Sequence, residues 1–139
     1  MILFRNPVYI LTMLTMSSIY FSSTGIQFWT ILYLQNILDT PQVKSQFIFV
    51  LCAATSPIPG ALLGSAVADA YGGYKGKNQV TALKICCIFA CFASIFAVWL
   101  VFINDNLTFT FALWMLLFLG ASMVPTAYGI IVSSVGKEL

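Results

Sequence analysis

Charged side chains are scarce in this sequence, and histidine is missing. Only six Lys or Arg and four Asp or Glu occur among 139 residues, whereas 60% of the residues are hydrophobic. Soluble domains carry about a quarter of their residues as charges. A soluble helical protein would also need polar outer faces on its helices, and the long segments of this chain are apolar nearly all round. The composition therefore indicates lipid, and not water, as the main solvent.

The lack of histidine also removes the usual partner of cysteine in mixed zinc sites. The four cysteines, Cys52, Cys86, Cys87 and Cys91, lie inside apolar segments and form no paired Cys-x-x-Cys groups. We interpret them as small apolar packing residues. The sequence predicts no catalytic residues, no metal, no cofactor and no nucleic-acid partner, so an enzyme is not expected.

The few charges leave four long uncharged windows. They run from Arg5 to Asp39, from Lys44 to Asp69, from Lys84 to Asp105 and from Asp105 to Lys137. About 20 apolar residues, rising about 1.5 Å each, cross a hydrocarbon layer of about 30 Å, and each window is long enough. Because lipid offers no partner for free backbone groups, and because the strict alternation of barrel strands is missing, helices are required.

The prediction is an all-α integral membrane protein, a single multi-pass transmembrane domain over residues 1–139 in contact with the lipid bilayer. Its four transmembrane helices are expected at about 8–37, 46–71, 79–103 and 107–135. Four spans place both termini and the middle loop on one side, which then carries five basic residues: Arg5, Lys75, Lys77, Lys84 and Lys137. The other side has only Lys44, so the positive-inside rule predicts cytoplasmic termini.

The first predicted span is unusually polar in its middle and outer half. At helical spacing Ser23, Gln27 and Thr30 share one face, with Thr24 beside them. Such a stripe points toward neighbouring helices or an aqueous cavity, and these four residues are candidates for substrate binding. Two interpretations of Gln27 stay open: it hydrogen-bonds a substrate near the bilayer midplane, or it bonds another helix.

Prolines and glycines mark weak points in two other spans. Pro57 and Pro59 remove backbone donors from the second span and predict a break or kink there. Just after them, Gly60 and Gly64 have the small-x-x-x-small spacing that lets another helix approach closely. Pro125 marks a second helix-breaking point, in the fourth span, and broken helices are common around transport sites.

The connection between the second and third spans combines a carboxylate, two glycines and basic residues. Gly72 and Gly73 permit positive φ in a tight turn, and Lys75 supplies charge at headgroup level. Asp69 is then expected to bond helix amides or a basic residue in one conformation and to release them in another. The alternative is that these residues only anchor the chain at the membrane edge.

These residues resemble the major facilitator superfamily, whose corresponding loop has the pattern Gly-x-x-x-Asp-x-x-Gly with basic residues nearby. Asp69 and Gly72 match this spacing, whereas Ser65 stands where glycine is usual and Gly73 where arginine is usual. The segment Thr24-Gly25-Ile26-Gln27-Phe28-Trp29, together with Gly72-Gly73-Tyr74-Lys75 and Val124-Pro125-Thr126, looks like the second half of spinster-like members.

The resemblance implies helices seven to ten of a twelve-helix transporter, part of a six-helix half-bundle. By position it gives Gln27 a place in the central cavity, and it gives Asp69, Gly72, Gly73 and Lys75 a gating role. It also implies transport of a lipid or organic solute by alternating access, with the remaining helices as partners. The alternative is a small four-helix accessory subunit of a larger membrane complex, in which Gln27 and the glycines serve helix contacts.

Overall fold

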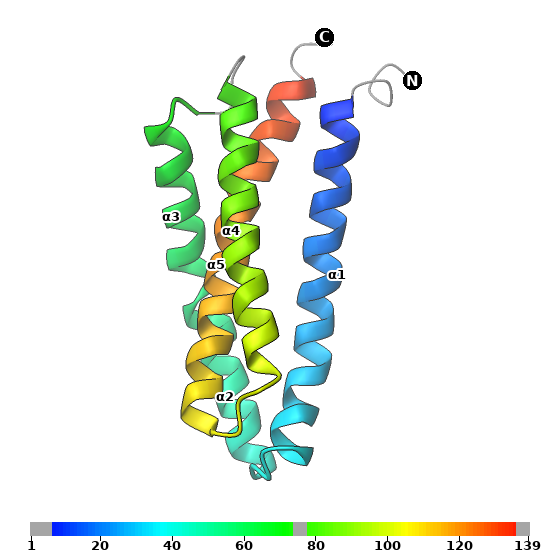
Figure 1. Ribbon diagram of the computed structural model, residues 1–139, viewed down its shortest axis with the longest axis vertical. Coiled ribbons are helices and arrows are strands. Elements are labelled where there is room, and N and C mark those ends of the chain that lie inside the picture. The colour runs from blue at the N-terminus through cyan, green and yellow to red at the C-terminus, as the bar shows by residue number, and fades with distance from the viewer. Residues whose placement is uncertain (1–6, 74–77, 136–139) are drawn as a thin grey trace.

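The structure is a computed structural model that describes residues 7–73 and 78–135 (Figure 1). It has five helices in these residues: α1 (Pro7–Asn36), α2 (Gln42–Thr55), α3 (Pro57–Ala70), α4 (Asn78–Leu100) and α5 (Asn106–Val135). Figure 1 shows α1, α4 and α5 running along the long axis, with α2 and α3 following each other end to end beside them. α1 begins, α3 ends, α4 begins and α5 ends at one end of the bundle, which we call the terminal end. The all-helical prediction is confirmed.

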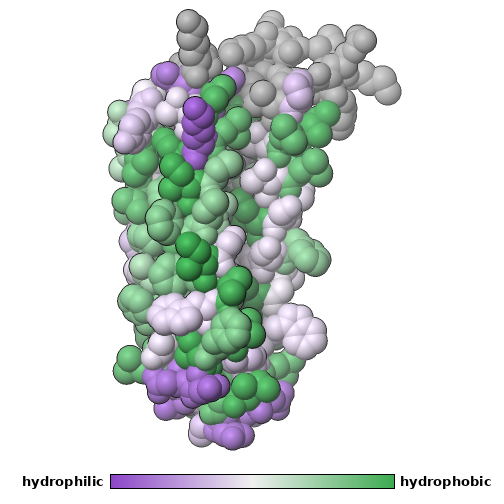
Figure 2. Space-filling model, viewed as in Figure 1, coloured by the Kyte–Doolittle hydropathy of each residue, from purple (hydrophilic) through white to green (hydrophobic). Residues whose placement is uncertain are grey.

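Three helical stretches are long and apolar enough to cross a membrane, namely Gln42–Ala70, Asn78–Leu100 and Asn106–Ser133. They correspond to the last three predicted spans. α1 also has no charged residue in its 30 residues, but it is not among the three, because its Ser, Thr and Gln side chains lower its hydropathy. Figure 2 shows apolar surface over the middle of the bundle and hydrophilic surface at its two ends.

The second stretch is divided by a single residue, Ser56, which separates α2 from α3. Pro57 is the first residue of α3, so the structure places the division where the prolines predict it. The backbone N–H of Ser56 donates to the Cys52 carbonyl at 3.0 Å, and Gly60 N–H donates to the Ser56 carbonyl at 3.2 Å. The Ser56 side chain is fully buried, and its hydroxyl has no hydrogen-bond partner in the described chain.

Pro125 does not have the predicted effect, because α5 continues through it to Val135. A proline removes one donor from a helix, and in membrane helices nearby hydroxyls and neighbouring helices compensate. Next to Pro125, the Thr126 hydroxyl donates to the Gly64 carbonyl at 3.4 Å and holds this part of α5 against α3. The prediction of a helix break at Pro125 is therefore wrong in this structure.

α3 packs tightly on α5 through small side chains at every fourth position. The buried residues along this line are Cys52, Ser56, Gly60, Gly64 and Ala68. A Cβ atom added to Gly60 would meet the Phe118 carbonyl oxygen, and one added to Gly64 would meet that of Ser122 and lie 2.9 Å from Ser122 Cα. We call this contact the α3–α5 seam. Gly60 and Gly64 thus bring two backbones together, as their spacing predicts.

The buried side chains of α1 lie toward its two ends and not in its middle. Thr12 and Met16 are buried near the terminal end, and Thr30 and Leu34 near the other. Leu34 belongs to a buried cluster with Phe109, Leu113 and residues of α2. From residue 17 to residue 29 no side chain of α1 is buried. α1 packs mainly on α5 and α2 and has little contact with α4.

Asp105 caps the start of α5 at the end opposite the terminal end. Its carboxylate accepts hydrogen bonds from the backbone N–H and the hydroxyl of Thr108, each at 3.0 Å. The backbone bond from Thr108, followed by its hydroxyl bond, lowers the pKa of Asp105 below its ordinary value. Nearby, the Thr40 hydroxyl donates to Asn106 Oδ1 at 2.7 Å and joins the two short connections at this end.

We expect this cap to make stability depend on acid. A carboxyl group whose pKa is lower in the folded state stabilises the fold above its unfolded pKa, 3.8, and this contribution disappears as the pH falls through the lower folded value. Asp105→Ala should lower the thermal midpoint in detergent at pH 7 and should flatten its dependence on pH below about 4. Asn104→Ala is the control and should keep the wild-type pH profile. An unchanged profile in Asp105→Ala would contradict the cap.

Candidate functional site

A cavity of about 800 Å³ lies between the middle of α1 and the facing sides of α4 and α5. We call it the α1 cleft. α1 contributes Ser22 and Ser23 to its wall, α4 contributes Ser94, and α5 contributes Gly120. The cleft lies where α1 has no buried residue, so it is the space left by a helix packed only at its ends.

The Ser and Thr hydroxyl groups from Thr15 to Thr24 of α1 fall into two sets. Those of the first set donate to the backbone carbonyl four residues earlier, at 2.8 to 3.0 Å: Thr15, Ser17, Ser18 and Thr24. This is the usual way in which Ser and Thr satisfy their donors inside a helix. Ser22 and Ser23 make no such bond in the described chain, and both line the cleft. Their donors remain available on the cleft side.

The predicted substrate-binding residues do not all lie together. Ser23 lines the α1 cleft. Thr30 is buried and lines a second, smaller cavity of about 280 Å³ between α1 and α5. Thr24 and Gln27 are exposed and line neither cavity. Each residue turns about 100° around a helix, so four residues after Ser23 the side chain has rotated about 40° and Gln27 leaves the cleft face.

The cleft also contains three polar or small residues that are not among the predicted substrate-binding residues. Ser18 lies one turn before Ser22 in the same polar helix, and this spacing is its signal in the sequence. Ser94 comes from α4, for which the sequence suggested only packing. Gly120 has no atom within 4 Å of where its Cβ would lie, so the cleft extends to the α5 backbone. Only the three-dimensional arrangement brings these three residues together.

A pair of tyrosines connects α1 and α5 at the margin of the cleft. The hydroxyl oxygens of Tyr20 and Tyr128 lie 2.8 Å apart and share a hydrogen bond. Tyr20 also lines the cleft. Both phenols are exposed, and Tyr128 lies on the turn of α5 that follows Pro125. The pair therefore ties α1 to α5 on the side of the cleft toward the terminal end.

The predicted gating loop is described in part. Gly72 and Gly73 have φ values of 93° and 72°, the left-handed conformation for which glycine is suited. The Asn78 side-chain amide donates to the Gly72 carbonyl at 2.7 Å and fixes the turn against α4. Asp69 is exposed, and its carboxylate bonds no side chain or amide of the described residues. Lys75 lies outside the described residues.

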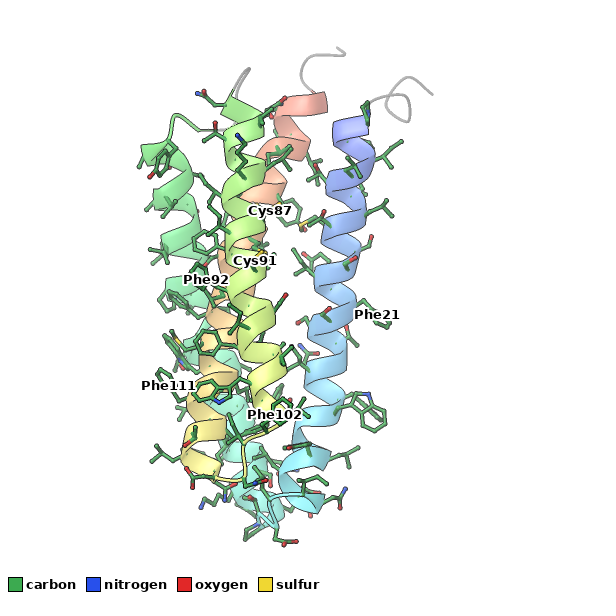
Figure 3. All side chains as sticks on the ribbon, in the orientation of Figure 1. Phe21, Cys87, Cys91, Phe92, Phe102 and Phe111 are labelled. Atoms are coloured by element: carbon green, nitrogen blue, oxygen red, sulfur yellow. The ribbon has the colours of Figure 1, made fainter. Side chains whose placement is uncertain are left out.

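The cysteines divide into a buried and an exposed pair. Cys52 and Cys86 are buried and pack against α5, as expected of small apolar residues. Cys87 and Cys91 are exposed on α4 (Figure 3), so they are not part of the buried packing. Among residues 7–73 and 78–135, no three His, Cys, Asp or Glu side chains are grouped closely enough to hold a metal ion.

The volume of the α1 cleft falls within the range of about 300 to 1,000 Å³ that is typical of small-molecule sites. No family model, curated protein or solved structure matches this chain. The cleft and the helices around it are therefore the features of this chain that bear on its function.

Proposed function

We propose that this chain is part of an integral membrane transporter of the facilitator type, and that the α1 cleft forms part of its solute pathway. The observation that supports this most is the cleft itself. Its hydroxyl-lined wall lies midway along helices of which two, α4 and α5, are long and apolar enough to cross a bilayer. In many transporters the solute binds near the bilayer midplane.

In this proposal α1 is the fourth membrane-spanning segment. It has 30 residues and no charge, and it runs alongside the three more apolar stretches (Figure 1). Its polar side chains lower its hydropathy, but several of them bond the α1 backbone or face the cleft, so lipid does not have to solvate them. The bias of basic residues toward the terminal end supports placing that end in the cytoplasm.

The second proposal is an accessory subunit whose cleft is filled by a helix of another protein. The α3–α5 seam favours this second proposal, because it shows that small residues of this chain bring helices into backbone contact. The two proposals differ in what reaches the cleft. A transporter needs water and solute there in at least one conformation, whereas a packing groove excludes both.

Access of water to residue 23 tests the proposed function. In the full-length protein in its membrane, with Cys87 and Cys91 replaced by alanine, Ser23→Cys should react at least about tenfold faster with a membrane-impermeant methanethiosulfonate than Phe21→Cys. Phe21 is the matched control, because it is 83% exposed on the face of α1 turned away from the other helices (Figure 3) and would face lipid. The thiolate is the reactive form, and apolar surroundings suppress it.

Equal and slow labelling at positions 21 and 23 would show that water does not reach the cleft, so the cleft could not be part of an aqueous pathway. It would leave the accessory-subunit proposal as the better account. Rapid labelling at both positions would contradict the membrane placement of α1.

A further inference from the structure

Ser22 and Ser23 leave two hydrogen-bond donors unused at one place in the α1 cleft. The four other Ser and Thr hydroxyls from Thr15 to Thr24 bond carbonyls of α1 itself. Ser94, on the opposite wall, also donates to a carbonyl of its own helix, that of Ala90, at 2.8 Å. The chain thus satisfies most cleft hydroxyls internally and leaves an adjacent pair free.

A free donor in an apolar surrounding has a cost. Ser22 is exposed and Ser23 is half-buried, so water can satisfy their hydroxyls until a ligand displaces it. A hydroxyl that loses water and gains no other partner then costs about 1–3 kcal/mol in protein mutational data. Most other residues of the cleft wall are apolar, among them Ile19, Ile26, Leu116 and Leu117. A ligand oxygen that accepts from Ser22 and Ser23 would remove this cost, so the pair favours a ligand with an acceptor at that position.

The residues that line the cleft also indicate that the ligand carries no charge. Every described residue that lines the cleft is uncharged. An ionised group that enters such a site loses its hydration and gains no counter-charge, which is far more costly than the loss of one hydrogen bond. The apolar wall and the free hydroxyl pair together define a ligand with an apolar body and a neutral polar group.

We propose that the α1 cleft binds an uncharged, largely apolar solute, and that Ser22 and Ser23 hold its hydrogen-bond-accepting oxygen, as in a ketone, ester or ether. This deepens the proposed function and rests on its assignment of the cleft as the solute site. Ser22 and Ser23 select the oxygen, whereas Gly120 leaves room for the apolar body against α5.

The test uses three photoreactive probes of equal chain length. Each carries a diazirine in the middle of an alkyl chain, and the chains end in a methyl group, a methyl ketone or a carboxylate. The purified full-length protein in lipid nanodiscs is irradiated with each probe, and mass spectrometry locates and quantifies the labelled residues. We expect the ketone to label cleft residues of α1, α4 and α5 at lower concentration than the alkane or the carboxylate.

The serine variants connect the selectivity to the hydroxyl pair. Replacing both residues, Ser22→Ala with Ser23→Ala, should weaken ketone binding about 3- to 30-fold, as expected for one or two neutral hydrogen bonds, and should leave alkane labelling unchanged. Ser17→Ala is the matched control, because Ser17 lies on α1 outside the cleft and bonds the Met13 carbonyl. It should change neither probe.

Two results would overturn the proposal: carboxylate labelling equal to ketone labelling, or ketone labelling unaffected by loss of both serines. The outcome is separate from that of the thiol-accessibility experiment. Selective ketone binding in a cleft that water never reaches would count against transport alone. Rapid labelling of Ser23→Cys without probe selectivity would count against this inference alone.

Discussion

Gly64→Leu should separate α3 from α5 and strongly destabilise the protein. At Gly64 even a Cβ would meet the backbone of Ser122, and backbone cannot rotate away as a flexible side chain does. Overpacking of an interior typically costs about 1–3 kcal/mol, and a backbone clash belongs at the upper end. We expect about 3 kcal/mol or more of lost unfolding free energy, measured by titration with sodium dodecyl sulfate and followed by helical circular dichroism.

Gly120→Leu is the matched control for this substitution. Gly120 is also a helical glycine, on α5, but nothing lies within 4 Å of its Cβ position and the side chain would enter the α1 cleft. Its unfolding free energy should stay close to wild type, since exchanging glycine inside a helix is itself favourable by a few tenths to about 1 kcal/mol. Equal loss of stability in the two variants would show that the α3–α5 seam is not specific.

Ile88→Asp should impair membrane insertion of α4. Ile88 lies near the middle of α4 and is 55% exposed, so in water this change would be a surface substitution worth within about 0.5 kcal/mol. In a bilayer a carboxylate at the centre of a span costs about 2.5–3.5 kcal/mol on the translocon scale. The apparent free energy of insertion of α4, obtained from the ratio of inserted to translocated protein with glycosylation reporters in microsomes, should rise by that amount.

Val43→Asp provides the comparison at the membrane edge. Val43 is 80% exposed, but it lies in the first turn of α2 beside Lys44, where water and headgroups solvate a charge. Insertion of the Gln42–Ala70 stretch should change by less than about 1 kcal/mol. If Ile88→Asp were as mild as Val43→Asp, the exposed apolar surface of this chain would not face lipid.

The helices and the α3 side of the seam were predictable from the sequence, because each depends on a local pattern. Uncharged length defines the spans, proline imposes the division at Ser56, and four-residue glycine spacing marks a surface for close contact. The partner surface at Phe118 and Ser122 was not predictable, since backbone carbonyls accept a neighbouring helix whatever their side chains are. The uninterrupted course of α5 through Pro125 was not predictable either, because membrane helices tolerate proline when their surroundings compensate for the missing donor.

The candidate site was predicted only in part, for a geometric reason. A polar stripe in a sequence defines the face of a helix only to within a residue or two. Ser23 of the stripe lines the cleft together with its neighbour Ser22, whereas Gln27 points away from it. Ser94 and Gly120 carry no local pattern that indicates a cavity. Their importance arises from how α4 and α5 approach α1, which the order of residues along one helix does not specify.

The way in which α1 is attached limits how the molecule can move. A helix that is packed toward both of its ends can move away from the bundle only if the contacts at one end break. Loss of the buried contacts of Thr12 and Met16 would open the α1 cleft toward the terminal end, and loss of those of Leu34 would open it toward the opposite end. In the proposed transporter, two separate sets of contacts on one helix would therefore allow the cleft to open on either side of the bundle.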